Sequence, residues 1–226
     1  MQQNKKRTYH PILFSFYFLI LLYFILDATG CVKGVVRTEN STGEWKCDED
    51  ADQIMMRGDY QGSILIHERF LERQPDNGLA LYHLGYIYGL TGEHDKEISF
   101  YQRAISSGYR NGIILFNLGM AYGELGDLSD SINTFKRGIE IDPDNPDLHF
   151  GLGMAYQRSS SFDQAEMEFL KTVELSPDNL DARFYLGLQY ADNGDNEKAR
   201  EQAMEIMKIN RDSAFAKEIL ARIKER

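Results

Sequence analysis

Histidines and acidic residues are the side chains of this sequence that could carry metal or catalytic chemistry. His67, His83, His94 and His149 do not follow the spacing of a metal-binding motif and are spread along the chain. The acidic run at residues 47–52, CDEDAD, resembles a cation site, but acids at a helix start are explained more simply by the helix dipole and by solvation. The serine-hydrolase elbow, the phosphate-binding glycine loop and the H-E-x-x-H motif are absent from the sequence. We therefore predict a protein that is not an enzyme and has no catalytic residue, cofactor or metal.

Cys31 has the most specific predicted chemistry, which is lipid attachment. A basic stretch at residues 5–7, KKR, precedes an uncharged apolar run at residues 11–26. This order is typical of a secretory signal peptide. The small residues at 28–31, ATGC, then resemble a bacterial lipobox, in which the cysteine is acylated and becomes the mature N-terminus. Residues 1–30 are accordingly predicted to be a signal peptide or a membrane anchor.

Three alternatives remain open for this N-terminal segment. The first is lipidation at Cys31, although Ala28 replaces the leucine that is usual in a lipobox. The second is an uncleaved signal anchor, although the apolar run is slightly shorter than the roughly 17–25 residues that span a bilayer. The third is simple secretion after cleavage near Gly30. Each alternative places the body outside the cytoplasm, and we expect a location in the cell envelope with the N-terminus anchored to a membrane.

Residues 31–43 are predicted to form a flexible tether, because they are rich in small residues and show no apolar period. Cys47 is a lone thiol if Cys31 is lipidated; otherwise a disulfide between the two is compatible with an oxidising compartment. The tripeptide NST at residues 40–42 matches a glycosylation acceptor, which matters only in a eukaryotic secretory route. We prefer the lipobox interpretation, under which this match is chance.

The charge of the chain argues against nucleic acid as a partner. The formal net charge is −10 at pH 7, and the basic residues do not form a stripe. Proteins that bind nucleic acid need clustered basic groups that neutralise phosphates. The acidity is most simply explained as a solvated surface.

A strict sequence period organises the rest of the chain. Leu-Gly pairs begin 34 residues apart at Leu84, Leu118, Leu152 and Leu186, and a tyrosine follows four residues after each leucine. Such a period indicates one supersecondary unit stacked on copies of itself. The predicted units are 78–111, 112–145, 146–179 and 180–213, preceded by a degenerate unit at 44–77. Each is expected to contain two helices joined by a turn.

This pattern resembles the tetratricopeptide repeat (TPR) family, with its Leu-Gly pair, its following tyrosine, a turn glycine and a closing proline. The resemblance covers residues 44–213. It implies an all-α fold, a right-handed solenoid of antiparallel helix pairs. Residues 214–226 place Phe215, Ile219, Leu220 and Ile223 on one helical face, so we expect a C-terminal capping helix there.

The resemblance also implies a concave groove lined by the first helix of each unit. An aromatic residue and, four positions later, a second large apolar residue share one face of each first helix. The predicted partner-binding residues are Tyr82, Tyr86, Phe116, Met120, Phe150, Met154, Phe184 and Leu188. The competing interpretation is that the aromatic residues partly bury against the neighbouring helix and serve the fold.

These features predict a membrane-tethered adaptor that binds an apolar or amphipathic segment of a partner protein or peptide. The clamp of basic and amide residues with which some TPR proteins hold acidic peptides is missing from the groove positions. TPR lipoproteins that assist the assembly of cell-envelope complexes are an analogy at the level of the fold. The alternative is a structural scaffold protein that forms a homo-oligomer through the groove and has no peptide ligand.

Overall fold

The computed structural model describes residues 49–224, which form eleven helices and no strand. The all-α solenoid predicted from the sequence period is confirmed for these residues. The helices are α2 (Glu49–Met56), α3 (Tyr60–Arg73), α4 (Gly78–Leu90), α5 (His94–Ser106), α6 (Gly112–Leu125), α7 (Leu128–Ile141), α8 (Pro146–Arg158), α9 (Phe162–Leu175), α10 (Leu180–Asn193), α11 (Asn196–Ile209) and α12 (Ala214–Lys224).

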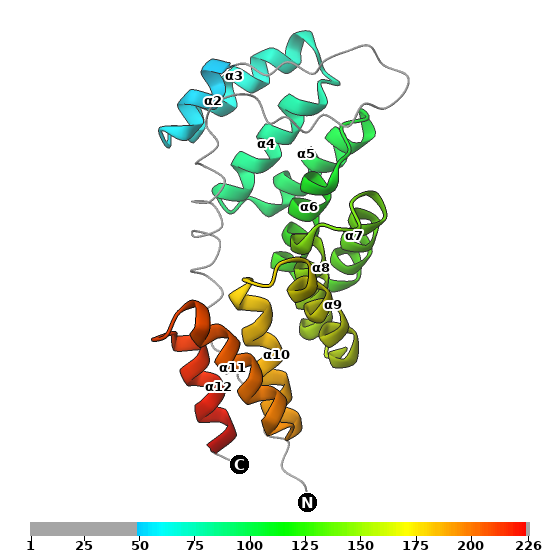
Figure 1. The fold of residues 1–226 in the computed structure, drawn as a ribbon. Helices are drawn as coiled ribbons and strands as arrows, with labels where there is room; N and C mark the ends of the chain where they lie inside the picture. Colours follow the sequence, from blue (N-terminus) through cyan, green and yellow to red (C-terminus); the bar gives the residue numbers. More distant parts are fainter. Residues whose placement is uncertain (1–48, 225–226) are drawn as a thin grey trace, which may run out of the picture. The chain divides into compact units, whose positions relative to one another are not determined.

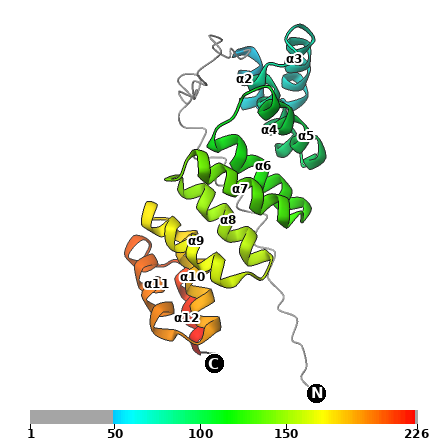
Figure 2. The ribbon, with the colours of Figure 1, turned by 90° about the vertical axis from the view of Figure 1, so that its right-hand side faces the viewer.

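Consecutive helices pack against one another along the whole described chain, as Figures 1 and 2 show. The closest packing joins α4 with α5, α6 with α7, α8 with α9, and α10 with α11. Each of these pairs then contacts the next pair through its second helix. The first helices also touch one another, α4 with α6 and α6 with α8. The rings of Phe150 in α8 and Tyr185 in α10 also meet, with centroids 6.1 Å apart, so equivalent side chains of the four first helices follow one another along the stack.

An asparagine begins each of the four first helices. The side chains of Asn77, Asn111, Asn145 and Asn179 accept hydrogen bonds from backbone N–H groups of the first turn, at 2.9–3.0 Å. An N-cap of this kind satisfies a donor that the helix itself cannot, and it contributes about 1 kcal/mol. Because these caps recur with the sequence period, the first helices begin in register.

The core runs through the stack as a series of buried contacts between first and second helices. Leu84, Leu118 and Leu186 of the first helices are at most 2% exposed, and so is Phe135 of α7. At the C-terminal end α12 packs on both α10 and α11, where it buries Ile219 completely. The last helix pair therefore has a covered apolar side.

The predicted signal segment at residues 1–30 and the predicted tether at 31–43 lie outside the described residues. Among the helices that the structure describes, none is long and apolar enough to cross a membrane.

Candidate functional site

The eight predicted groove residues are all half-buried in the structure. Tyr82 and Tyr86 come from α4, Phe116 and Met120 from α6, Phe150 and Met154 from α8, and Phe184 and Leu188 from α10. We call this set the apolar row. Because residues four apart lie on one side of a helix, each helix contributes one neighbouring pair.

The aromatic side chain that comes first in each pair also packs against other side chains of the fold. Phe116 lies against Phe135 with 6.0 Å between ring centroids, and Phe150 lies 5.8 Å from Phe169. Both partners are almost completely buried rings of the second helix in the same pair. The aromatic members thus serve packing through one side of the ring, while the rest of the ring remains accessible.

Tyr82 and Tyr86 make the N-terminal end of the apolar row more polar than its middle. Their rings stack with centroids 6.5 Å apart, and Asn117 of α6 donates a hydrogen bond to the Tyr82 hydroxyl at 3.3 Å. Burial, together with the neighbouring hydroxyls of Tyr109 and Tyr86, raises the pKa of Tyr82. The two phenols are therefore neutral hydrogen-bonding groups at this end.

The C-terminal end of the apolar row is covered by the last helix. Phe184 stacks on Phe215 of α12 with 4.5 Å between the ring centroids. The contact holds the Phe184 ring from one side, so α12 helps to position the end of the row.

Two carboxylates stand beside the apolar row on α8 and α10. Asp147 and Asp181 each precede the aromatic member of their helix by three residues, which places them on the same helix face. Burial raises the pKa of Asp147, and it raises that of Asp181 to about 6. At neutral pH the carboxylate of Asp181 is ionised in partly desolvating surroundings, where a cation would be favourable.

Several exposed large apolar side chains of the described residues lie elsewhere, on the second helices α9 and α11. Met167 of α9 is 68% exposed and Met204 of α11 is 57% exposed, and Leu170 and Met207 lie near them in sequence on the same helices. Sequence reasoning did not single out these residues, because they interrupt an otherwise polar face. These four residues, Met167, Leu170, Met204 and Met207, are a second set of candidate contact residues, which we call the outer apolar residues.

A shallow depression also lies over α6, between α5 and α7. It encloses about 380 Å³ and is lined by Gln102, Tyr122, Asp130 and Arg137 among others. The lining is mostly polar and includes no member of the apolar row. It therefore does not extend the candidate groove.

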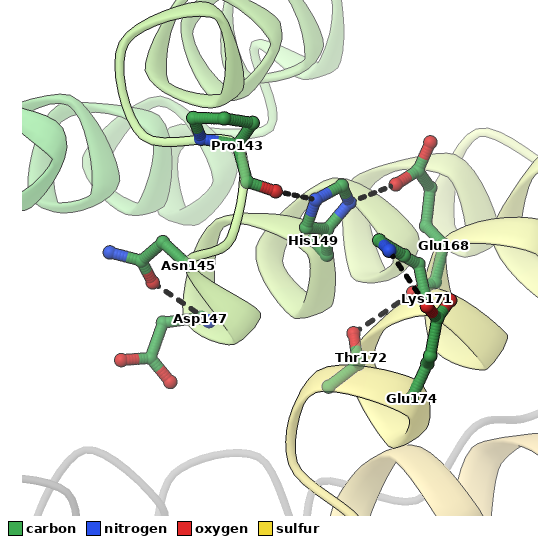
Figure 3. A network of polar contacts seen from close by, with 8 residues as sticks. All are labelled: Pro143, Asn145, Asp147, His149, Glu168, Lys171, Thr172 and Glu174. Atoms are coloured by element: carbon green, nitrogen blue, oxygen red, sulfur yellow. Dashed lines mark hydrogen bonds and ion pairs between the residues drawn. The ribbon is translucent and has the colours of Figure 1, made fainter.

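The histidine of α8 has a structural role. Figure 3 shows His149 between two acceptors, with Nδ1 2.7 Å from Glu168 of α9 and Nε2 3.0 Å from the backbone carbonyl of Pro143. The ring joins α8 to α9 and to the turn before α8. His149 is largely buried and has one carboxylate partner, which agrees with a packing function.

The structure corrects the sequence-based expectation that the remaining histidines lie apart. His67 of α3 and His83 of α4 have ring centroids 5.2 Å apart, and Asp52 of α2 lies 3.0 Å from His83 Nδ1. Sequence reasoning treated Asp52 as part of a solvated acidic run. The three residues are about fifteen positions apart along the chain, which is not the spacing of a metal-binding motif. The packing of the three successive helices brings them together. We call these three residues the N-terminal cluster.

Comparisons with known proteins give matches to TPR families and folds. The family model described as "Tetratricopeptide repeat" matches residues 57–113 and 150–214, and the one described as "TPR repeat" matches residues 119–160. A search of curated proteins found no match.

Several solved structures share the fold. YrrB, described as "a TPR protein with an unusual peptide-binding site", is 21% identical, with 76% of this chain and 89% of YrrB covered and a TM-score of 0.66. MamA is 22% identical, with 80% and 100% covered and a TM-score of 0.65. A tetratricopeptide repeat protein from Parabacteroides merdae is 19% identical, with 78% and 70% covered and a TM-score of 0.69. The family models together cover more than half of the sequence, so this chain belongs to the tetratricopeptide repeat family.

Proposed function

We propose that this protein is a non-enzymatic adaptor whose apolar row binds an amphipathic segment of a partner protein. The observation that carries the proposal is the row itself, in which the first helices α4, α6, α8 and α10 present half-buried apolar side chains along successive units. The peptide-binding site of the structurally similar YrrB supports this class of function.

The chemistry of the row indicates the chemistry of the partner. Met120 and Met154 occupy its middle, and methionine adapts its shape to different apolar surfaces. An amphipathic helix laid in a groove would bury its apolar face against these side chains. Asp147 and Asp181 beside the row favour lysine or arginine at the edge of that face. We therefore infer a partner segment that combines an apolar stripe with flanking basic residues.

The proposal is tested by matched methionine-to-aspartate variants. In Met120→Asp/Met154→Asp the new charges enter the row, and affinity for a synthetic amphipathic helix with a leucine face and lysine borders should fall at least tenfold, as measured by fluorescence anisotropy. Met167→Asp/Met204→Asp adds the same charges to the outer apolar residues and should bind as the parent does.

Circular dichroism is the folding control, and both double variants should keep the parent's helical signal. Co-purification from the protein's own membranes is the second measurement. Partner proteins that co-purify with the parent should be lost with the row variant and kept with the outer variant. Loss of binding with the outer variant alone would contradict the proposal and assign recognition to the second helices.

The outer apolar residues support a second candidate function, which is self-association as a scaffold. Met167 is 68% exposed, and exposed apolar side chains that gather into one patch mark interaction sites. Light scattering of the full chain should then show a dimer that Met167→Asp/Met204→Asp abolishes. A monomer at every concentration would exclude self-association.

We also infer from the N-terminal residues that the protein is tethered to a membrane of the cell envelope through a lipid on Cys31. The basic stretch, the apolar run and the ATGC sequence support this inference. Metabolic labelling with palmitate is expected to mark the parent and not Cys31→Ser. Label that persists in Cys31→Ser would contradict lipidation at this residue.

A further inference from the structure

The N-terminal cluster brings three potential metal ligands together from three helices. The Asp52 carboxylate lies 3.0 Å from His83 Nδ1 and 3.9 Å from His67 Nε2. One ligand atom from each residue lies within 4.8 Å of the other two. The side chain of His67 is fully buried, whereas those of His83 and Asp52 are 15% and 26% exposed. The cluster is therefore anchored in the core and reachable from solvent through its outer members.

The repeat register shows that the positions of Asp52 and His67 carry aromatic or apolar side chains in the later repeats. One to three periods after His67 stand Tyr101, Phe135 and Phe169, all at most 1% exposed. The first repeat thus carries an imidazole where the next three repeats carry a core ring.

The residues that contact this ring also differ between the first repeat and the later ones. Phe135 lies against Gly151, and Phe169 stacks on Tyr185 with 5.5 Å between centroids. Asn117, Gly151 and Tyr185 are the register equivalents of His83. The equivalents of Asp52 are the second members of the apolar row, Tyr86, Met120, Met154 and Leu188. Within the described chain, two imidazoles and a carboxylate therefore occur together at these positions only where unit 44–77 meets unit 78–111.

This replacement has an energetic cost that a bound cation would offset. An imidazole or carboxylate buried in place of an apolar side chain loses its hydration. A buried polar cluster is in general no more stable than apolar packing of the same volume. A metal ion turns the same side chains into a cross-link between helices, because its binding free energy adds to the stability of the folded state.

We propose that Asp52, His67 and His83 form a binding site for a zinc-class divalent transition metal. Two imidazole nitrogens and one carboxylate oxygen suit Zn²⁺ better than Ca²⁺ or Mg²⁺, which prefer oxygen ligands alone. Ligand atoms around a tetrahedral zinc lie about 3.4 Å apart. The two separations from Asp52, 3.0 Å and 3.9 Å, bracket this value, and the two imidazole nitrogens lie within 4.8 Å of each other, so side-chain rotations could close the site.

Three protein ligands leave a fourth coordination position open on the solvent side. The ion would join α2, α3 and α4, and so fix the degenerate first repeat to the first complete one. This inference is independent of the apolar row and does not require a partner protein.

The test uses the full chain after dialysis against a chelator. Titration with Co²⁺, a spectroscopic substitute for Zn²⁺, should give visible absorption bands that saturate at one ion per chain. Zn²⁺ should displace Co²⁺ and raise the midpoint of thermal unfolding by about 5 °C. Hydrogen exchange should slow in α2, α3 and α4 on adding Zn²⁺, while α10 to α12 stay unchanged.

Variants of the ligands separate metal binding from folding. His83→Asn and Asp52→Asn should weaken Zn²⁺ binding by roughly 100-fold or more, since loss of a ligand exceeds the loss seen for outer-shell residues. His67→Phe restores the ring type of Phe135 and Phe169, so it should stay folded and lose the response to Zn²⁺. His149→Gln is the matched control, because His149 also pairs with a carboxylate, and it should bind as the parent does.

Three results would overturn the proposed metal site. No saturable Co²⁺ or Zn²⁺ binding by the parent up to about millimolar concentration would reject the site. Parent-like binding by folded His83→Asn and His67→Phe would also reject it. Loss of binding in Cys47→Ser with no effect of the three ligand variants would assign the ion to thiolate instead.

Discussion

Glu97 of α5 is a buried carboxylate at a position where other second helices carry small residues. It is 1% exposed, and its Oε2 lies 2.8 Å from His94 Nδ1. Ser131 and Ala165 are its equivalents one and two periods later. Burial raises the pKa of Glu97 to about 7, and the bond to His94 opposes this rise only in part. A carboxyl group with a raised pKa is held more favourably in its protonated form.

Glu97 should make stability fall as the pH rises. Its pKa in the unfolded chain is about 4.5, so between pH 4.5 and 7 the folded state binds the proton more strongly. The favourable contribution is complete below pH 4.5 and is lost as the pH passes 7. We expect the melting temperature of the parent to decrease more between pH 5 and pH 8 than that of Glu97→Gln. An identical pH profile for the two proteins would show that Glu97 does not titrate in this range.

Ser160 is the residue in the described chain whose backbone is unfavourable for its type. Its φ is 63°, whereas Gly126 and Gly194 hold the equivalent turn with φ near 85°. Left-handed backbone is costly for residues with a Cβ. Ser160→Gly should therefore stabilise the protein by about 0.5–1 kcal/mol in urea unfolding, and Gly126→Ser should destabilise it similarly. Destabilisation by Ser160→Gly would mean that the Ser160 side chain contributes more than its backbone costs.

At the scale of elements, close approach of a first helix to its own second helix depends on single glycines. A Cβ on Gly119 of α6 would lie 2.8 Å from the Phe135 ring of α7. A Cβ on Gly123, one turn later on the same helix, would meet its nearest atoms at 3.5 Å. The two glycines thus differ in packing while sharing the same helix.

This difference predicts opposite effects for the same substitution. Gly119→Ala should destabilise by about 1–3 kcal/mol, because the buried ring has no space to move. Gly123→Ala should be neutral or stabilise by up to about 1 kcal/mol through its higher helix propensity. Chemical denaturation of both variants measures the effects. Equal effects would show that α6 and α7 adjust their distance freely.

The elements were predictable from the sequence to a greater extent than the candidate sites. The 34-residue period and the turn glycines predict the helix pairs, because both depend on local chemistry that repeats. The sequence left open whether Phe150 packs against the neighbouring helix, since the contact with Phe169 depends on the distance between two helices. The N-terminal cluster was missed because its residues share no motif. Alignment by the period, which puts His67 in the place of Phe135, is the signal that could have revealed it.

At the scale of the whole described chain, each repeat contacts mainly its neighbours. The stability of such a protein is a sum of repeat and interface contributions rather than one global value. Ile219 of α12 tests this property, because it is fully buried and its Cδ1 fills the space beside Gly187. Removal of the Ile219 side chain should destabilise the C-terminal helices more than the rest of the stack.

Ile219→Ala should cost about 2–5 kcal/mol locally through the cavity it leaves. Hydrogen exchange should accelerate in α10, α11 and α12 and stay unchanged in α4 and α5. Lys217→Ala, an exposed change on the same helix, is the control and should leave both regions unaffected. Uniform acceleration over all helices would instead show that the stack unfolds as one cooperative unit.

Contacts restricted to neighbouring helices also affect how the chain acquires its structure. Strong packing joins helices that follow one another directly, or with one helix between them, along the chain. Little loop-closure entropy opposes such contacts, so folding is expected to be fast. A repeat that has emerged from a ribosome or a translocation channel can pair with the preceding one while the remainder is still threading through. Each unit can therefore fold onto the preceding one while synthesis or export continues, starting from the N-terminal side.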